Sequence, residues 1–117
     1  MAKQIEGEPY HRMSVDEASE LHGSDDVAFI DVRRMDEYLE GHVKGAQFIT
    51  VDDILARIEE LPSDKKLLFI CAAGVRSGLA CEMAAAMGIE ADRLFNVEEG
   101  TPTWISKGYP TSTGVDI

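Results

Sequence analysis

Residues 67–77 read Leu67-Leu68-Phe69-Ile70-Cys71-Ala72-Ala73-Gly74-Val75-Arg76-Ser77. The first four residues form a continuous apolar run, which is typical of a strand buried on both faces of a parallel sheet. A glycine-containing loop follows directly, and from Ser77 onward apolar residues recur at the spacing of a helix that ends at Gly88. The predicted core-facing side of that helix consists of Leu79, Ala80, Met83, Ala84 and Met87. The stretch therefore predicts a strand, a tight loop and a helix, the repeating unit of an α/β fold.

The same alternation continues on both sides of this stretch. Short apolar runs at 27–30, 47–49 and 94–97 predict further strands. A capping box that joins Ser14 to Glu17 predicts a helix that stops before Gly23. Short helices are expected at 35–40 and 101–107, and a longer one at 52–61, with Ile54, Leu55, Ile58 and Leu61 on one face. Because strands and helices alternate with short connections, we expect a largely parallel sheet with helices on both faces.

Length and composition are those of one domain. The chain has 117 residues, of which 44% are apolar, and this is enough to form a core without disulfides or a structural metal. The sequence contains no repeat and no linker-like tract. We therefore expect a single domain over residues 1–117, with a core at 10–110 and loosely attached ends at 1–9 and 111–117.

Charge and targeting features exclude several classes of function. Eleven Lys and Arg residues against 22 Asp and Glu residues give a net charge of −11, which repels nucleic acids and anionic lipid surfaces. No apolar run reaches the ~20 residues of a membrane-spanning helix, and the N-terminal residues lack the apolar stretch of a signal peptide. Two cysteines do not make a secreted disulfide framework. These features predict a cytoplasmic protein that binds neither nucleic acid nor a membrane.

The position of Cys71 points to chemistry. It follows a buried strand directly, and ligands of open α/β sheets bind beyond the carboxyl ends of the strands. A loop that curls from strand to helix directs backbone N–H groups inward, and these groups stabilise a thiolate. Gly74 permits the curled backbone, and the guanidinium of Arg76 suits an oxyanion on a bound donor. The alternative is that Cys71 is an ordinary buried cysteine, the commonest role of this residue type.

The segment Cys71 to Ser77 resembles the active-site loop of single-domain rhodaneses, Cys-x-x-Gly-x-Arg-Ser. Three further stretches are similar to the family pattern and occur in the same order: 30–33 with 37–38, 41–46, and 97–104 continuing to 108–110. The resemblance covers the chain from about Ser14 to Pro110. It implies a rhodanese-like α/β fold with a five-stranded, mostly parallel central sheet.

The same resemblance implies a sulfurtransferase that needs neither metal nor organic cofactor. Cys71 would take a sulfane sulfur from thiosulfate or a persulfide and pass it to a thiol, a protein or cyanide. The surrounding loop would bind the substrate through Ala72, Ala73, Gly74, Val75, Arg76 and Ser77. Cysteine phosphatases related to this family have one more residue between the cysteine and the arginine of this loop, whereas only four residues separate Cys71 from Arg76. The shorter loop favours sulfur transfer over phosphatase activity. The alternative function is a rhodanese-fold module that carries sulfur, binds a partner or senses redox state, with little turnover.

The loop departs from many active family members at Ala72 and Ala73, where those proteins carry basic or hydrogen-bonding side chains. This departure predicts a high KM for thiosulfate and a persulfide or protein as the better donor.

Several other residues receive supporting roles. The resemblance implies that Asp31 and Arg33 brace the active-site region, and the alternative is that they form an exposed ion pair. It also implies a structural role for His42 in the turn that contains it. We expect Cys81 to fill the core, because reaching Cys71 from one turn beyond the loop is difficult. Trp104 is expected to pack the last helix onto the sheet. No second His or Cys lies at metal-ligand spacing, so the sequence predicts no metal site.

Overall fold

A five-stranded sheet forms the centre of the computed structural model, which describes residues 2–117. The spatial order is β1-β6-β5-β2-β4, and every neighbouring pair is parallel. The strands are β1 (His11–Met13), β2 (Val27–Asp31), β4 (Gln47–Phe48), β5 (Lys66–Ile70) and β6 (Leu94–Val97). The predicted α/β fold with a central parallel sheet is therefore confirmed, and the apolar run 67–70 lies in its middle strand. The short edge strand β1 was not predicted from its residues.

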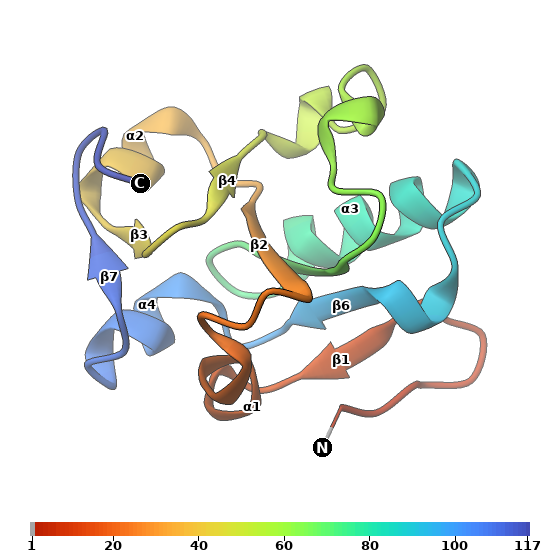
Figure 1. Cartoon of the computed structure of the whole chain (residues 1–117), viewed down its shortest axis with the longest axis horizontal. Coiled ribbons are helices and arrows are strands. Elements are labelled where there is room, and N and C mark those ends of the chain that lie inside the picture. Colours follow the sequence, from red (N-terminus) through yellow and green to blue (C-terminus); the bar gives the residue numbers. More distant parts are fainter. Residues whose placement is uncertain (1) are drawn as a thin grey trace.

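Helices cover both faces of this sheet (Figure 1). The helices are α1 (Val15–Leu21), α2 (Met35–Glu40), α3 (Val75–Ala86) and α4 (Gly100–Ser106). Side chains of β5 alternate between the two faces, as the geometry of a strand requires. Leu67 and Phe69 pack in the cluster that includes residues of α3, whereas Leu68 and Ile70 pack in the cluster that includes residues of α1 and Trp104 of α4. The sheet is thus buried on both sides, and this explains why its central strand is apolar throughout.

The predicted helix over 52–61 is wrong. Two short 3₁₀ segments, η1 (Val51–Asp53) and η2 (Ile58–Glu60), take its place. Ile54 and Leu61 are buried, but Leu55 is 48% exposed, so the apolar residues do not form one buried face. An isolated helix of this length is marginal in water, and packing against the core therefore decides the local conformation.

Helix α3 differs from the prediction in its start and in its buried face. It begins at Val75, two residues earlier than expected, after Gly74 with φ +88°. Its buried residues are small: Ser77, Gly78, Ala80, Cys81 and Ala84. Leu79 and Met87, which were expected to face the core, are 46% and 53% exposed. Small side chains on the inner face let the helix approach the sheet closely, and a Cβ added at Gly78 would lie 3.2 Å from Asn96 Nδ2.

The C-terminal segment is attached to the body of the protein rather than loose. Strand β7 (Thr111–Ser112) pairs antiparallel with β3 (His42–Val43). Beyond it, the Gly114 N–H donates to the Leu39 carbonyl at 2.8 Å. At the other end, Lys3 and Arg12 form a β-bridge, while Met1 lies outside the described residues. Within residues 2–117, no helix has both the length and the apolarity needed to cross a lipid bilayer.

Candidate active site

The loop after β5 curls around the sulfur of Cys71. This residue is 1% exposed, and its carbonyl accepts a hydrogen bond of 2.8 Å from the Thr101 N–H at the start of α4. The Gly74 N–H donates to Cys71 Sγ at 3.2 Å, and Ser77 Oγ lies 3.2 Å from the same atom. The loop therefore places an amide and a hydroxyl around a single sulfur atom.

Gly74 is required by the backbone of this loop. Its φ of +88° lies in the left-handed region, where L side chains are strained. A Cβ at this position would also lie 2.6 Å from the carbonyl oxygen of Glu98, in the segment between β6 and α4. The loop therefore packs tightly against the segment between β6 and α4, and this packing holds the loop amides in place.

The pKa values of the two cysteines are shifted in opposite directions. Burial raises the pKa of the Cys71 thiol, but hydrogen bonds from the Ser77 hydroxyl and from the amides of Ser77, Ala73 and Gly74 outweigh it, so the net pKa is lowered. Burial raises the pKa of the Cys81 thiol well above its usual value, and nothing comparable opposes it. Cys81 is fully buried among apolar side chains on α3, as a residue that fills the core would be. Of the two thiols, Cys71 is the one poised to ionise.

Asn96 is a residue of this site that the sequence analysis missed. Its Nδ2 donates to the Gly74 carbonyl at 3.0 Å, which fixes the amide so that Oδ1 accepts the Ser77 hydroxyl at 2.6 Å. Ser77 has one hydroxyl proton and two neighbours able to accept it, Asn96 Oδ1 and the Cys71 thiolate. The signal that could have revealed Asn96 is a polar amide in the middle of a buried apolar strand.

We expect Ser77→Ala to make Cys71 less reactive at neutral pH. Removing a donor to the thiolate disfavours the charged form, so the pKa of Cys71 rises and the alkylation curve moves to higher pH. A charge-assisted hydrogen bond is worth at least about 1.5 kcal/mol, so the midpoint of the alkylation curve should move upward by about one pH unit. The measurement is the alkylation rate against pH, with the modified residue identified by peptide mass. An unchanged curve would show that the hydroxyl stays with Asn96 in the thiolate state.

Arg76 is not the free cation that the sequence suggested. Its Nη1 and Nη2 donate to Glu37 Oε1 and Oε2 of α2 at 2.6 and 2.9 Å. The hydrogen bonds from Arg76 lower the pKa of Glu37 to about 2. A lowered carboxyl pKa means that the ion pair stabilises the fold above pH 4.5 and is lost only as the pH falls through about 2. The guanidinium is therefore neutralised at every physiological pH.

Asp31 and Arg33 form a buried ion pair at the end of β2. Asp31 is fully buried and Arg33 is 5% exposed, which contradicts the alternative of an exposed ion pair. Arg33 Nε and Nη2 donate to the Asp31 carboxylate at 3.0 and 2.7 Å, and Nη2 also reaches the Gly41 carbonyl at 2.8 Å. The pair thereby ties β2 to the end of α2.

His42 is fully buried and stacks on Tyr38 at a centroid distance of 3.7 Å. Its two ring nitrogens lie 2.8 and 2.5 Å from the carbonyl oxygens of Tyr38 and Asp116. Both ring nitrogens therefore face backbone carbonyl oxygens, an arrangement that fits a structural part in the turn. Trp104 is likewise buried in the core beneath α4, and its indole N–H donates to the Pro110 carbonyl at 2.8 Å.

Two hollows flank the Cys71 loop. One, of about 630 Å³, lies beside α3 and is lined by residues that include Ala73, Gly74, Val75 and Glu82. The other, of about 470 Å³, lies between α2 and α4 and is lined by residues that include Ala72, Arg33 and Thr101. Together they leave the loop accessible from two sides although the sulfur itself is covered.

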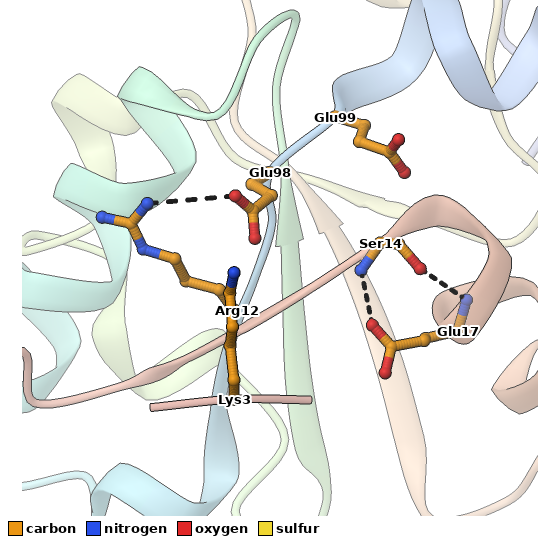
Figure 2. Close-up of a pocket in the computed structure, with 6 residues that line it drawn as sticks. All are labelled: Lys3, Arg12, Ser14, Glu17, Glu98 and Glu99. Carbon is orange, nitrogen blue, oxygen red and sulfur yellow. Dashed lines mark hydrogen bonds and ion pairs between the residues drawn. The ribbon is translucent and has the colours of Figure 1, made fainter. Parts of the chain in front are cut away.

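A third hollow, of about 330 Å³, lies where β1 and β6 end (Figure 2). Its arginine and its glutamates make contacts within the fold. Arg12 lies 3.9 Å from Glu98, Ser14 and Glu17 form the predicted capping box, and Glu99 accepts the Val15 N–H at 2.8 Å. These contacts fix the start of α1. In residues 2–117, no three His, Cys, Asp or Glu side chains gather as a metal ion would require.

Comparison with known proteins agrees with this geometry. The model of the rhodanese-like domain family matches residues 14–107. Bacillus subtilis YtwF, whose name proposes a sulfurtransferase, is 32% identical over 90 residues, which cover 77% of this chain and 84% of that protein. B. subtilis YrkF, whose name proposes a sulfur carrier, is 30% identical over 78 residues, or 67% of this chain and 41% of that one.

A solved structure shows the same architecture. The crystal structure of a rhodanese-related protein from Thermoplasma volcanium superposes with a TM-score of 0.76 at 28% identity, and the match covers 88% of this chain and 98% of that one. The strand order, the cysteine loop after the central strand and these matches lead to one assignment. The chain belongs to the rhodanese-like domain family.

Proposed function

We propose that the chain is a sulfurtransferase in which Cys71 carries a sulfane sulfur from a donor to an acceptor. One observation carries the proposal: Cys71 Sγ lies 3.2 Å from both the Gly74 N–H and Ser77 Oγ, inside a loop that holds one sulfur. Hydrogen-bond donors at this range stabilise the anion that attacks and the anion that forms. The proposal is supported by the rhodanese-like family and by relatives named for sulfur transfer.

The reaction has two steps of covalent catalysis. The Cys71 thiolate attacks the outer sulfur of thiosulfate, the donor S–S bond breaks, and its electron pair leaves with sulfite. Cys71 then holds a persulfide anion. A thiolate acceptor attacks the terminal sulfur, the bond between Cys71 Sγ and that sulfur breaks, and its electron pair restores the Cys71 thiolate. Charge balances in both steps, and neither step requires a metal or an organic cofactor.

We propose that a persulfide is a better donor than thiosulfate. Thiosulfate is a dianion, and the guanidinium of the loop, that of Arg76, is already engaged by Glu37. Ala72 and Ala73 add no side-chain donor to the loop. Backbone amides alone can hold the single charge of a persulfide sulfur. Because the reaction needs Cys71 as a free thiolate, we further propose the reducing cytoplasm as the compartment in which the protein acts.

The test is a mass measurement followed by a turnover assay. The purified chain is mixed with thiosulfate, or with a low-molecular-weight persulfide, and its intact mass is recorded. We expect the gain of one sulfur atom, more rapidly from the persulfide, and thiocyanate production after addition of cyanide. Phosphatase turnover without any sulfur gain would contradict the proposal.

We expect Glu37→Gln to improve the use of thiosulfate. The amide keeps an acceptor for the Arg34 N–H but no longer neutralises Arg76, which becomes available to the sulfite group. A charge-assisted hydrogen bond of about 1.5 kcal/mol corresponds to a roughly tenfold lower KM for thiosulfate. Glu60→Gln is the matched control, because Glu60 forms a comparable two-point pair with Arg57 on an exposed surface. Equal KM values in both variants would show that Arg76 does not reach the donor.

The second candidate function is a sulfur carrier with little free turnover. It is favoured by the burial of Cys71, which slows attack by small acceptors, and by the likeness to YrkF. The mass assay separates the two functions. A carrier loads one sulfur and releases no thiocyanate, whereas an enzyme releases thiocyanate in excess over protein.

A further inference from the structure

Helix α3 carries an unpartnered apolar ridge that begins at the active-site loop. The ridge consists of Val75, Leu79, Met83 and Met87, spaced four residues apart, and the residues at this spacing lie along one side of a helix. Val75 is 79% exposed, Leu79 is 46% exposed and Met87 is 53% exposed, while Met83 is partly buried. We name these four residues the α3 ridge.

The ridge reverses the usual arrangement of a surface helix. A helix of a globular protein normally turns its large apolar residues to the core and its polar residues to water. Here the buried face is made of small residues such as Ala80 and Ala84, whereas Val75, Leu79 and Met87 are exposed. Met83 packs partly against the core. Large apolar residues exposed along one side of a helix offer a surface on which another molecule can bind.

The ridge adjoins the reacting atom. Val75 follows Gly74, whose N–H donates to Cys71 Sγ. Val75 and Leu79 also line the hollow of about 630 Å³ beside the loop. A partner that covers the ridge therefore lies against the loop from which sulfur is donated or received.

The charges around this hollow select the kind of partner. Glu8, Glu82 and Glu98 line it, and the single cation among the lining residues is Arg12. Arg12 is engaged by Glu8 through Nε at 2.9 Å and Nη2 at 2.5 Å. Within residues 2–117, Glu82 forms no ion pair. Glu98 forms one long ion pair, in which its carboxylate lies 3.9 Å from the Arg12 guanidinium. The apolar ridge thus has an acidic border, which is complementary to a cationic surface.

We propose that the α3 ridge and its acidic border dock a protein segment with apolar side chains flanked by Lys or Arg, and that this protein exchanges sulfur with Cys71. The inference rests on the proposed function and names its partner class. A second copy of this chain is the wrong occupant, because each copy carries a net charge of −11 and the same acidic border.

The docking test uses binding and does not depend on sulfur transfer. The probe is a short fluorescein-labelled helical peptide with leucines on one face and lysines beside them, and its twin has glutamate in place of lysine. Fluorescence anisotropy is measured with the full chain at low and high salt. We expect the lysine peptide to bind at least about tenfold more tightly than the twin, with a preference that shrinks as salt screens the charges.

Matched variants assign that binding to the ridge. The double variant Leu79→Gln and Met87→Gln should weaken it about fivefold or more, and Glu82→Gln about threefold. The controls are Val115→Gln and Glu20→Gln, which change an apolar and an acidic residue that are exposed elsewhere and should leave binding unchanged.

Three results would overturn the docking proposal: equal binding of the two peptides, equal binding by the ridge variants and their controls, or a concentration-dependent dimer in sedimentation that the double variant dissociates. Failure of the proposed function looks different. In that case Cys71 takes up no sulfur from any donor, while the peptide binding and its dependence on the ridge persist.

Discussion

In the Cys71→Ala variant we expect sulfur uptake and thiocyanate production to fall to background, a loss of about a thousandfold or more. The sulfur atom at this position is the only one that the loop surrounds with donors, at 3.2 Å from the Gly74 N–H and Ser77 Oγ. No other side chain of the site can form the persulfide. The measurements are the intact mass after incubation with thiosulfate or a persulfide and the rate of thiocyanate formation.

Cys81→Ala is the matched control for this variant. Cys81 is as buried as Cys71, and both belong to the same core cluster, so removing either sulfur has a similar cost of about 1 kcal/mol in unfolding free energy. The Cys81 thiol has a raised pKa and should stay neutral and unreactive. We expect Cys81→Ala to load sulfur like the parent chain. Sulfur uptake by Cys71→Ala, or its loss in Cys81→Ala, would assign the wrong cysteine to the reaction.

The largest expected effect on stability belongs to Gly100→Ala. Gly100 begins α4 with φ +84°, and a Cβ there would lie 2.0 Å from the Ala72 carbonyl oxygen and 2.9 Å from that of Cys71. The new methyl group overlaps the backbone of the active-site loop, so either the loop or α4 must move. Left-handed strain and the overlap together should cost roughly 4 kcal/mol of unfolding free energy, a large fraction of the stability of a small domain.

Gly45→Ala separates the overlap from the backbone strain. Gly45 has a nearly identical φ of +85°, but a Cβ there meets nothing within 4 Å. Its expected cost is the conformational one alone, about 1 kcal/mol. Urea unfolding of both variants gives the two free energies, and sulfur loading shows whether the loop has moved. Equal stability losses would mean that α4 is not pressed against the Cys71 loop.

The pattern of neighbouring residues predicted the structure correctly where a strand is buried along its whole length and where a helix cap depends only on adjacent residues. The run 67–70 reads as a central strand because a parallel sheet covered on both faces selects apolar residues at every position. The capping box of Ser14 and Glu17 depends only on neighbouring residues, and α1 begins as predicted. The pattern misled at 52–61, where a helical period without enough packing partners yields short 3₁₀ segments. It misled again on α3, whose buried face is made of small residues while Leu79 and Met87 remain exposed.

The α/β fold, the family resemblance and the cysteine at the centre of the site could be predicted from the sequence, because each depends on residues close together in the chain. The electrostatics around that cysteine could not, because they depend on which distant residues the fold brings next to it. Glu37, 39 residues from Arg76, neutralises the guanidinium, and Asn96, 19 residues from Ser77, competes with the thiolate for the hydroxyl proton. The state of a charge or a proton is set by the groups within a few ångströms of it, and in this chain the fold brings those groups together from distant segments.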